Sequence, residues 1–458
     1  MPNFVKVGFS TKDPELRAKE LDTTGLPHPF KVAYEILVNE PRDVEQLAHK
    51  ILKNNGFHEN KEFFNCSIEV AIASIRKAAK GEIILENIYD ADVPTECEDD
   101  SWVDDLIAWA EKSKIPEKYL PRKKADLLKL KELELDYSGI ELIGIPESIG
   151  NLTALEYLSL NGRQLVNLPS SIGNLIALEE LSLYQNQLTN IPASIGNLTA
   201  LKYLSLDQNQ LTSIPASIGN LTALQSLSLA ENKLTNIPAS IGNLTALKYL
   251  NLDENQLTSI PTSIGKLISL DGLYLFDNKL LDIPESIGNL ISLEKLDLAR
   301  NQLTRLPESI GYLTKLRELR LLENQLVAIP ESMGNLTSLK KLDLFRNKLT
   351  RIPESIGNLI ALEKLDLFEN NLVRIPKSIG NLTALKLLFL NNNQLVGIPE
   401  SIGNLIALEK LNLSKNQLTN LPKSIHNLIA LKELNVDQNK LSESNELSEF
   451  VTIVRTVF

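Results

Sequence analysis

Aliphatic residues recur in one fixed pattern of 23 positions through residues 126–441. Each unit begins with the alternation Leu-x-x-Leu-x-Leu, which predicts a short strand whose leucines, such as Leu204 and Leu206, point inward. The proline that follows, Pro215 in this unit, predicts the end of strand pairing because it lacks an N–H group and has a fixed φ. The next segment, Ser-Ile-Gly-Asn-Leu, predicts a tight turn or a short 3₁₀ helix in which Gly219 takes a positive φ.

The repeat keeps its length without an insertion between its prolines. Thirteen prolines stand 23 residues apart, at Pro146, Pro169, Pro192, Pro215, Pro238, Pro261, Pro284, Pro307, Pro330, Pro353, Pro376, Pro399 and Pro422. An asparagine follows each strand in the same register, from Asn186 to Asn439. Its amide can donate to and accept from backbone groups that a stacked turn hides from water. Such a period predicts a solenoid, a fold that mostly binds other molecules rather than transforming them.

Counting the Leu-x-Leu pairs gives about fourteen strands, from Leu133 to Val436. The pattern resembles the leucine-rich repeat family, and its Ile-Pro-x-Ser-Ile-Gly-Asn-Leu form is similar to bacterial repeats and to the plant intracellular Ras-group-related repeats. The resemblance implies an α/β solenoid, a horseshoe of about fourteen parallel strands. Ser138 and Arg163 replace the asparagine in the first two units, as is typical of the capped end of a solenoid.

The strand positions that are not leucine should face solvent on the concave side of the horseshoe. Small polar residues dominate the position between the two leucines and the position after the second in the early repeats, whereas aromatic residues and arginines gather from the seventh strand to the twelfth. The candidate partner-binding residues are Tyr274, Phe276, Arg320, Leu322, Phe345, Arg346, Phe368 and Phe389. Exposed aromatic residues with arginines are typical of protein-binding hot spots. The alternative is that the rings stack along the strands and only stiffen the sheet.

Residues 1–80 do not follow the repeat. Val-Lys-Val-Gly-Phe-Ser and residues 31–38 read as strands, and residues 61–66 as a short extended segment. Helices are expected over Asp13–Leu21, Pro41–Lys53 and Ser67–Ala79, with Asp13 and Pro14 suited to a helix start. This order predicts a small α+β domain.

The order of these blocks is similar to a phage-derived DNA-binding branch of the GIY-YIG nuclease superfamily. Lys6-Val7-Gly8 occupies the place of the family's second motif, and the resemblance implies Arg17, His49 and Glu62 as the catalytic residues, with Glu62 as ligand of a divalent metal such as Mg²⁺. The chain begins at Met1 without the expected Gly-Ile-Tyr strand and its tyrosine. We therefore expect a non-catalytic module, and an in-frame upstream extension would favour the enzyme instead.

Two further segments are expected to close the ends of the solenoid. Residues 81–125 hold an acidic linker followed by an amphipathic segment at Trp102–Lys112, predicted to cap its N-terminal end. The expected apolar face of that segment is Trp102, Leu106, Ile107, Trp109 and Ala110. Residues 442–458 break the repeat, and their apolar residues at helical spacing predict a C-terminal cap.

Composition and charge limit the ligands and the cellular location that the sequence predicts. The net charge is −11 over 458 residues, so no basic face indicates nucleic acid as ligand of the repeats. Two cysteines are too few for a disulfide framework, and no apolar run is long enough for a signal peptide or a membrane span. These features predict a cytoplasmic protein with no membrane partner.

The sequence thus predicts a scaffold or adaptor that binds a protein or peptide on its concave face, with no cofactor, and DNA is the expected ligand of residues 1–80. One alternative is a metal-dependent DNA endonuclease whose repeats select its target. A second is a secreted bacterial effector.

Overall fold

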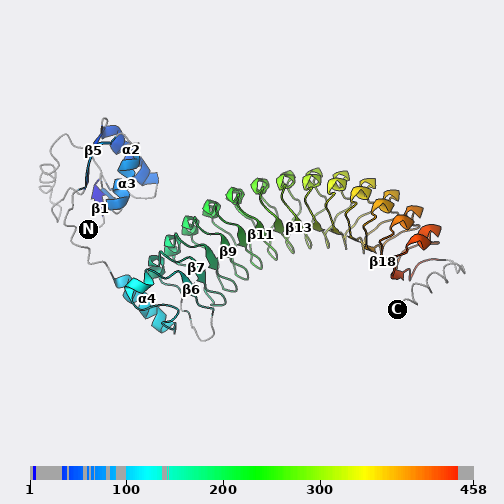
Figure 1. Ribbon diagram of the computed structural model, residues 1–458, viewed down its shortest axis with the longest axis horizontal. Helices are drawn as coiled ribbons and strands as arrows, with labels where there is room; N and C mark the ends of the chain where they lie inside the picture. The colour runs from blue at the N-terminus through cyan, green and yellow to red at the C-terminus, as the bar shows by residue number, and fades with distance from the viewer. Residues whose placement is uncertain are drawn as a thin grey trace. The chain divides into compact units, whose positions relative to one another are not determined.

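The computed structural model describes residues 4–6, 34–38, 41–54, 59–60, 63–65, 68–78, 83–88, 100–136, 142 and 144–441. The chain divides into two compact units, Met1–Asp100 and Ser101–Phe458 (Figure 1). The helix expected at Asp13–Leu21 and the cap expected over residues 442–458 lie outside the described residues.

The first unit is the expected α+β domain. Its elements are β1 (Phe4–Lys6), β2 (Tyr34–Val38), α2 (Pro41–Asn54), β3 (Glu59–Asn60), β4 (Phe63–Asn65), α3 (Ile68–Ala78) and β5 (Ile83–Ile88). Strand β4 pairs antiparallel with β1 and β3, and β2 pairs antiparallel with β5. Helices α2 and α3 share a small core of Ala48, Leu52, Ala71 and Ala78. Strand β5 lies where the acidic linker was expected to begin, so this unit extends beyond residue 80.

The second unit carries one open sheet of fourteen parallel strands, in the order of the chain. The strands are β6 (Glu132–Glu134), β7 (Tyr157–Ser159), β8 (Glu180–Ser182), β9 (Tyr203–Ser205), β10 (Ser226–Ser228), β11 (Tyr249–Asn251), β12 (Gly272–Tyr274), β13 (Lys295–Asp297), β14 (Glu318–Arg320), β15 (Lys341–Asp343), β16 (Lys364–Asp366), β17 (Leu387–Phe389), β18 (Lys410–Asn412) and β19 (Glu433–Asn435). From β7 onward each residue pairs with the residue 23 positions ahead, as Leu204 does with Leu227. The expected number and direction of strands are confirmed.

A 3₁₀ helix forms the return segment of each repeat, and these helices follow one side of the row of strands in Figure 1. They are η1 (Glu147–Asn151), η2 (Ser170–Asn174), η3 (Ala193–Asn197), η4 (Ala216–Asn220), η5 (Ala239–Asn243), η6 (Thr262–Lys266), η7 (Glu285–Asn289), η8 (Glu308–Tyr312), η9 (Glu331–Asn335), η10 (Glu354–Asn358), η11 (Lys377–Asn381), η12 (Glu400–Asn404) and η13 (Lys423–Asn427). The repeat proline precedes each helix in an extended conformation, with φ −69° at Pro215.

One continuous hydrophobic core runs through the second unit. Leu204 and Leu206 of the strand and Ile218 of the 3₁₀ helix are almost fully buried, as the alternation predicts. The asparagine ladder closes the turn beside this core. The Asn209 amide donates to the carbonyls of Leu183 at 2.9 Å and Leu206 at 3.0 Å, and its oxygen accepts from the Leu188 N–H at 3.0 Å.

The left-handed backbone conformation is found at a different residue from the one expected. Gly219 does not have a positive φ; the residue before each ladder asparagine does, as at Gln208 with φ 53°. Gly219 is needed for a different reason, since a Cβ there would lie 2.5 Å from the carbonyl oxygen of Ser240 in the next repeat. The 3₁₀ helices therefore stack too closely for a side chain at this position.

Helices α4 (Ser101–Lys112) and α5 (Lys124–Leu127) precede the first strand of the solenoid. Leu106, Trp109 and Ala110 of α4 are buried in the same core as the strand leucines, and so is Val103, which was not expected there. The Trp109 Nε1–H donates to the carbonyl of Gly144 at 2.9 Å. The amphipathic segment therefore covers the N-terminal end of the core. None of the helices in the described part of the chain has the length and apolar character to cross a lipid bilayer.

Candidate partner-binding surface

Each strand has three positions on the side of the sheet opposite its leucines: the residue before the first strand leucine, the residue between the two leucines, and the residue after the second. In β14 these are Glu318, Arg320 and Leu322 around the buried Leu319 and Leu321. We call these positions on β6–β19 the sheet face. Because consecutive strands pair residue for residue, equivalent side chains stand side by side along it, about 4.8 Å apart.

The expected aromatic residues lie on the sheet face in two groups, on β12 and on β15–β17. Tyr274, Phe276, Leu322, Phe345, Phe368 and Phe389, all half-buried, form what we call the aromatic patch on β12–β17. The rings of Phe345 and Phe368 stack with centroids 4.8 Å apart and planes 5° from parallel. Stacking of the kind considered in the alternative thus occurs at one pair, and it leaves the outer ring surfaces partly open to solvent.

Cations lie over three of the rings. The Arg346 guanidinium is 4.8 Å from the centroid of Phe345, and the Arg300 guanidinium is 5.3 Å from that of Phe276. The Lys364 ammonium is 5.8 Å from the centroid of Phe389. These distances allow cation–π attraction, which holds both partners in fixed positions.

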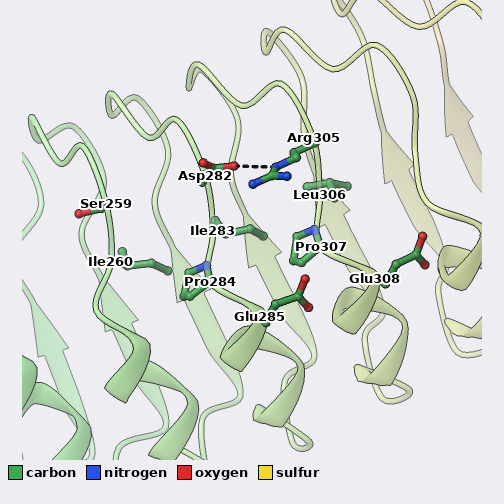
Figure 2. A pocket seen from close by; sticks show the side chains of 10 residues that line it. All are labelled: Ser259, Ile260, Asp282, Ile283, Pro284, Glu285, Arg305, Leu306, Pro307 and Glu308. Carbon is green, nitrogen blue, oxygen red and sulfur yellow. Dashed lines mark hydrogen bonds and ion pairs between the residues drawn. The ribbon is translucent and has the colours of Figure 1, made fainter.

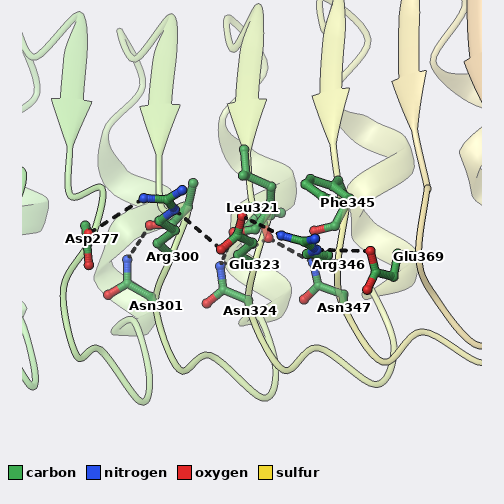
Figure 3. A network of polar contacts seen from close by, with 12 residues as sticks. Asp277, Arg300, Asn301, Leu321, Glu323, Asn324, Phe345, Arg346, Asn347 and Glu369 are labelled. Atoms are coloured by element: carbon green, nitrogen blue, oxygen red, sulfur yellow. Dashed lines mark hydrogen bonds and ion pairs between the residues drawn. The ribbon is translucent and has the colours of Figure 1, made fainter.

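The same arginines belong to a chain of ion pairs along the patch (Figure 3). Glu323 accepts Arg300 at 3.4 Å and Arg346 at 3.5 Å, and Arg346 also reaches Glu369 at 3.0 Å. Because partners 23 residues apart stand side by side, alternating charges at one repeat position neutralise each other. Ion pairs as exposed as these add little stability, but they orient the arginines.

Arg320 forms the most buried ion pair of the surface. Its Nη1 lies 2.6 Å from Oδ2 of Asp297, whose side chain is 7% exposed. Burial raises the pKa of Asp297, and the N–H of Ala299 and the charge of Arg320 oppose that rise. Burial, together with the charge of Asp366, likewise raises the pKa of Asp343. Four of the eight expected partner-binding residues, Phe276, Phe345, Arg346 and Phe389, thus take part in cation–π contacts. A fifth, Arg320, takes part in the ion pair with Asp297.

The residue that follows the second strand leucine has a backbone N–H that can donate a hydrogen bond on the sheet face. In most repeats an Asp or Asn side chain on the sheet face accepts it, as Asp253 does for Phe276 at 2.7 Å and Asp343 for Phe345 at 3.3 Å. Among the described residues, the N–H groups of Asp136, Asp207, Leu322 and Asn391 have no such acceptor, and only that of Leu322 lies within the aromatic patch. Since the acceptors elsewhere lie on the sheet face, these donors can be reached from it.

Sequence reasoning missed a row of tyrosines on the other half of the sheet face. Tyr157, Tyr203 and Tyr249 precede the first leucine of β7, β9 and β11, and Tyr203 and Tyr249 are 47% and 48% exposed. Only two of the three outward positions had been considered, and the row occupies the third. Reading the residue before each Leu-x-Leu pair would have found it.

Of the residues expected to form a nuclease site, the structure describes only His49, so this expectation stays a prediction. His49 lies half-buried on α2, while Arg17 and Glu62 are outside the described residues. Nowhere in the described part of the chain do three or more metal-ligating side chains gather.

A depression on the flank of the solenoid is a weaker candidate (Figure 2). It lies between consecutive Ile-Pro segments and is lined by Ile260, Ile283, Pro284 and neighbouring residues, with an exposed ion pair of 3.1 Å between Asp282 and Arg305. Its acids, Glu285 and Glu308, accept the N–H of a serine in the next repeat, at 3.4 and 3.3 Å. They therefore serve the stacking of the 3₁₀ helices.

Comparison with protein families matches both units. The model of the leucine-rich repeat region matches residues 117–205, 186–280, 273–350 and 339–455. The T5orf172 domain model matches residues 1–79. No curated protein matches the sequence significantly.

Solved structures match the repeats. A leucine-rich repeat protein of Leptospira interrogans is 36% identical, with a TM-score of 0.56, over 72% of this chain and 95% of that one. An internalin of Listeria monocytogenes is 27% identical, with a TM-score of 0.60, over 72% and 96%. A plant peptide hormone receptor in complex with RGF2 is 37% identical, with a TM-score of 0.62, over 69% of this chain and 52% of the receptor. With its repeat pattern, its fourteen-stranded sheet and these matches, the chain belongs to the leucine-rich repeat family.

Proposed function

We propose that this protein is a scaffold or adaptor that binds a protein or peptide partner through the aromatic patch. The observation that carries the proposal is the set of half-buried aromatic side chains on β12 and on β15–β17, with Leu322 on β14 between them, held in register and flanked by oriented arginines. Aromatic residues and arginines dominate the energetics of protein interfaces. Their mutual contacts reduce the conformational entropy that binding would otherwise remove.

An extended segment suits this surface best. Along the sheet face, Leu322 lies between Phe276 and Phe345 at the same repeat position. Its N–H has no acceptor within the described residues. A partner carbonyl or carboxylate oxygen could accept it while the partner's apolar side chains contact the rings. The plant peptide hormone receptor that is similar to this chain was solved in complex with RGF2, and a receptor for peptide hormones agrees with a peptide-sized ligand.

The test begins by selecting peptides from a random library on the full chain and measuring their affinity by calorimetry. Replacing Phe345 and Phe368 together with alanine should weaken binding by about 2 kcal/mol or more, roughly thirtyfold, because both anchors are lost. Tyr312→Ala is the matched control, since Tyr312 is 66% exposed and ends the 3₁₀ helix η8 rather than lying on the sheet face. Ser182→Ala with Ser205→Ala tests the distant strands β8 and β9. A ligand bound equally tightly by the double phenylalanine variant would restrict the aromatic residues to a stiffening role.

A role in nucleic-acid binding is proposed for the first unit, on the match of the T5orf172 domain to residues 1–79. Together with the resemblance of Arg17, His49 and Glu62 to a nuclease set, this match supports DNA as a ligand. Gel-shift assays of the full chain with and without Mg²⁺ separate binding from cleavage. Magnesium-dependent cleavage that is lost in Glu62→Ala would support the endonuclease alternative, and cleavage that persists would reject Glu62 as the metal ligand. The absence of a shift with single- and double-stranded DNA would reject the proposal. We propose that both activities act in the cytoplasm.

A further inference from the structure

The tyrosine row differs from the aromatic patch in what surrounds its rings. Tyr157, Tyr203 and Tyr249 stand on alternate strands, and Glu180 and Ser226 occupy the same position on the strands between them. A serine is short, so the ring faces of Tyr203 and Tyr249 on either side of Ser226 are open. In the described part of the chain, no cation lies over any of these three rings.

Charge at the sheet-face positions around the row has one sign only; the cations nearest in the chain, Lys202 and Lys248, precede Tyr203 and Tyr249, and Lys202 is paired with Glu179 at 2.7 Å. The eighteen sheet-face positions of β6–β11 hold no lysine or arginine, and their six acidic residues are Glu132, Glu134, Asp136, Glu180, Asp207 and Asp253. Burial raises the pKa of Asp253 to about 7, so this one is only partly charged at neutral pH. Hydrogen bonds from uncharged donors satisfy some of them; Asp207, for example, accepts the N–H of Ala230 at 2.7 Å and the hydroxyl of Ser228 at 2.6 Å. Such bonds leave the negative charge in place, so the row favours a cationic ligand and disfavours nucleic acid.

The spacing of the rings indicates the form of that ligand. Tyrosines on alternate parallel strands are about 9.6 Å apart. An extended polyproline II segment advances about 9.3 Å in three residues and returns its side chains to the same side. A cationic side chain at every third residue would therefore meet successive tyrosines.

We propose that the tyrosine row is a second binding surface, which takes an extended segment of a partner protein carrying arginine or lysine at every third residue. The guanidinium or ammonium groups lie against the tyrosine rings and next to Glu180, while serine and asparagine side chains of the sheet face contact the backbone of the segment. This surface adjoins the aromatic patch where the rings of Tyr249 and Tyr274 both lie beside Gly272, but it does not depend on Phe345 and Phe368.

The test uses fluorescence anisotropy of labelled twelve-residue peptides on the full chain. One probe repeats Arg-Pro-Ser four times, a second has the same composition with its four arginines in one block, and a third replaces each arginine with glutamate. The repeating arginine peptide should bind several-fold more tightly than the block peptide, and the glutamate peptide should not bind. Raising the salt from about 50 to 150 mM should weaken binding without removing the preference for the repeating peptide.

Variants assign the binding to the row. Tyr203→Ala with Tyr249→Ala should weaken the repeating peptide about tenfold, whereas Tyr203→Phe with Tyr249→Phe should retain binding because the ring supplies the attraction. Glu180→Gln should weaken it several-fold. Tyr312→Ala, and Phe345→Ala with Phe368→Ala, should bind it like wild type. A melting curve like that of wild type shows that the double alanine variant folds.

Three results would overturn the proposal: no binding of the repeating peptide at low salt, equal affinity for the block peptide, or unchanged affinity in the double alanine variant. None of these results would bear on the proposal for the aromatic patch, whose ligands depend on Phe345 and Phe368.

Discussion

The two halves of the sheet face share one backbone and differ in how their side chains are used. On β12–β17 four cations and four carboxylates occupy eighteen positions, and they include pairs such as Arg320 with Asp297. On β6–β11 the same number of positions holds six acidic residues and no cation. The first half offers rings already contacted by its own cations, and the second offers rings without them. A constant scaffold can thus present a neutral surface with fixed side chains beside an acidic one.

The comparison requires that the two halves share the same scaffold. Replacing a ladder asparagine in each half tests this, and it should give the largest loss of stability among the variants considered. Asn209 and Asn301 make equivalent hydrogen bonds, and the Asn301 amide donates to Leu275 at 2.8 Å. Replacing either with alanine leaves buried backbone groups unpaired and should lower the free energy of unfolding by about 1–3 kcal/mol. Arg163→Ala should have less effect, because an arginine already replaces the ladder asparagine at this position. Urea denaturation of the three variants checks this, and an equal loss in all three would contradict the role of the ladder.

The ion pair between Arg320 and Asp297 distinguishes the two halves, because the acidic half has no equivalent. Arg320→Met leaves a buried carboxylate without its cation and should destabilise the protein by about 1–2 kcal/mol at pH 8. The loss should fade as the pH falls, since a carboxyl whose pKa is raised becomes protonated at a higher pH than an ordinary one and then no longer needs a cation. Adding Asp297→Asn should restore stability.

The control for this pair is Arg317→Met, whose ion pair with Glu294 is exposed on both sides. No measurable change is expected from it. If both methionine variants unfold at the same denaturant concentration at pH 8, burial of Asp297 does not matter.

Asp253 marks the boundary between the halves and should give a smaller effect. Burial raises its pKa to about 7, so the native state holds a proton that the unfolded chain releases above about pH 4. Stability should therefore fall as the pH rises from about 4 to 7. Asp253→Asn keeps an acceptor for Phe276 and should stabilise the protein by about 1 kcal/mol at pH 8, with no gain near pH 4. A variant that gains nothing at pH 8 would contradict the burial of this charge.

The smallest effect concerns the 3₁₀ helices. Glu354 accepts the N–H of Ser378 at 3.1 Å, whereas Ala193, Ala216 and Ala239 hold the same position in the acidic half. Hydrogen bonds from Ser378 lower the pKa of Glu354, so its contribution is present above about pH 4.5 and is lost as the pH falls through the lowered pKa. Glu354→Ala should slightly lower the melting temperature at pH 7, and Ala216→Glu should slightly raise it. Opposite shifts would contradict a stabilising role for the hydrogen bond between Glu354 and Ser378.

Repetition explains how much of this fold the sequence could predict. A period of 23 residues fixes which residues are neighbours, so the strands, the buried leucines and the Asn209 ladder follow from it. The reason for Gly219 could not be predicted, because it depends on the distance between stacked 3₁₀ helices rather than on its own turn. Strand β5 was missed because its pairing with β2 is long-range and not periodic. Pairs such as Arg320 with Asp297 could be predicted from the register, whereas the depth of their burial could not.

Site-specific photo-crosslinking tests the account most directly. A benzophenone amino acid is placed at Phe345 on the aromatic patch, at Tyr203 on the tyrosine row and at Tyr312 in η8, and each chain is irradiated with a selected partner peptide or with the repeating arginine peptide. The account predicts that the selected peptide crosslinks at position 345, the arginine peptide at position 203, and neither at position 312. Crosslinking of both peptides mainly at position 312, or equally at all three positions, would contradict binding on the sheet face.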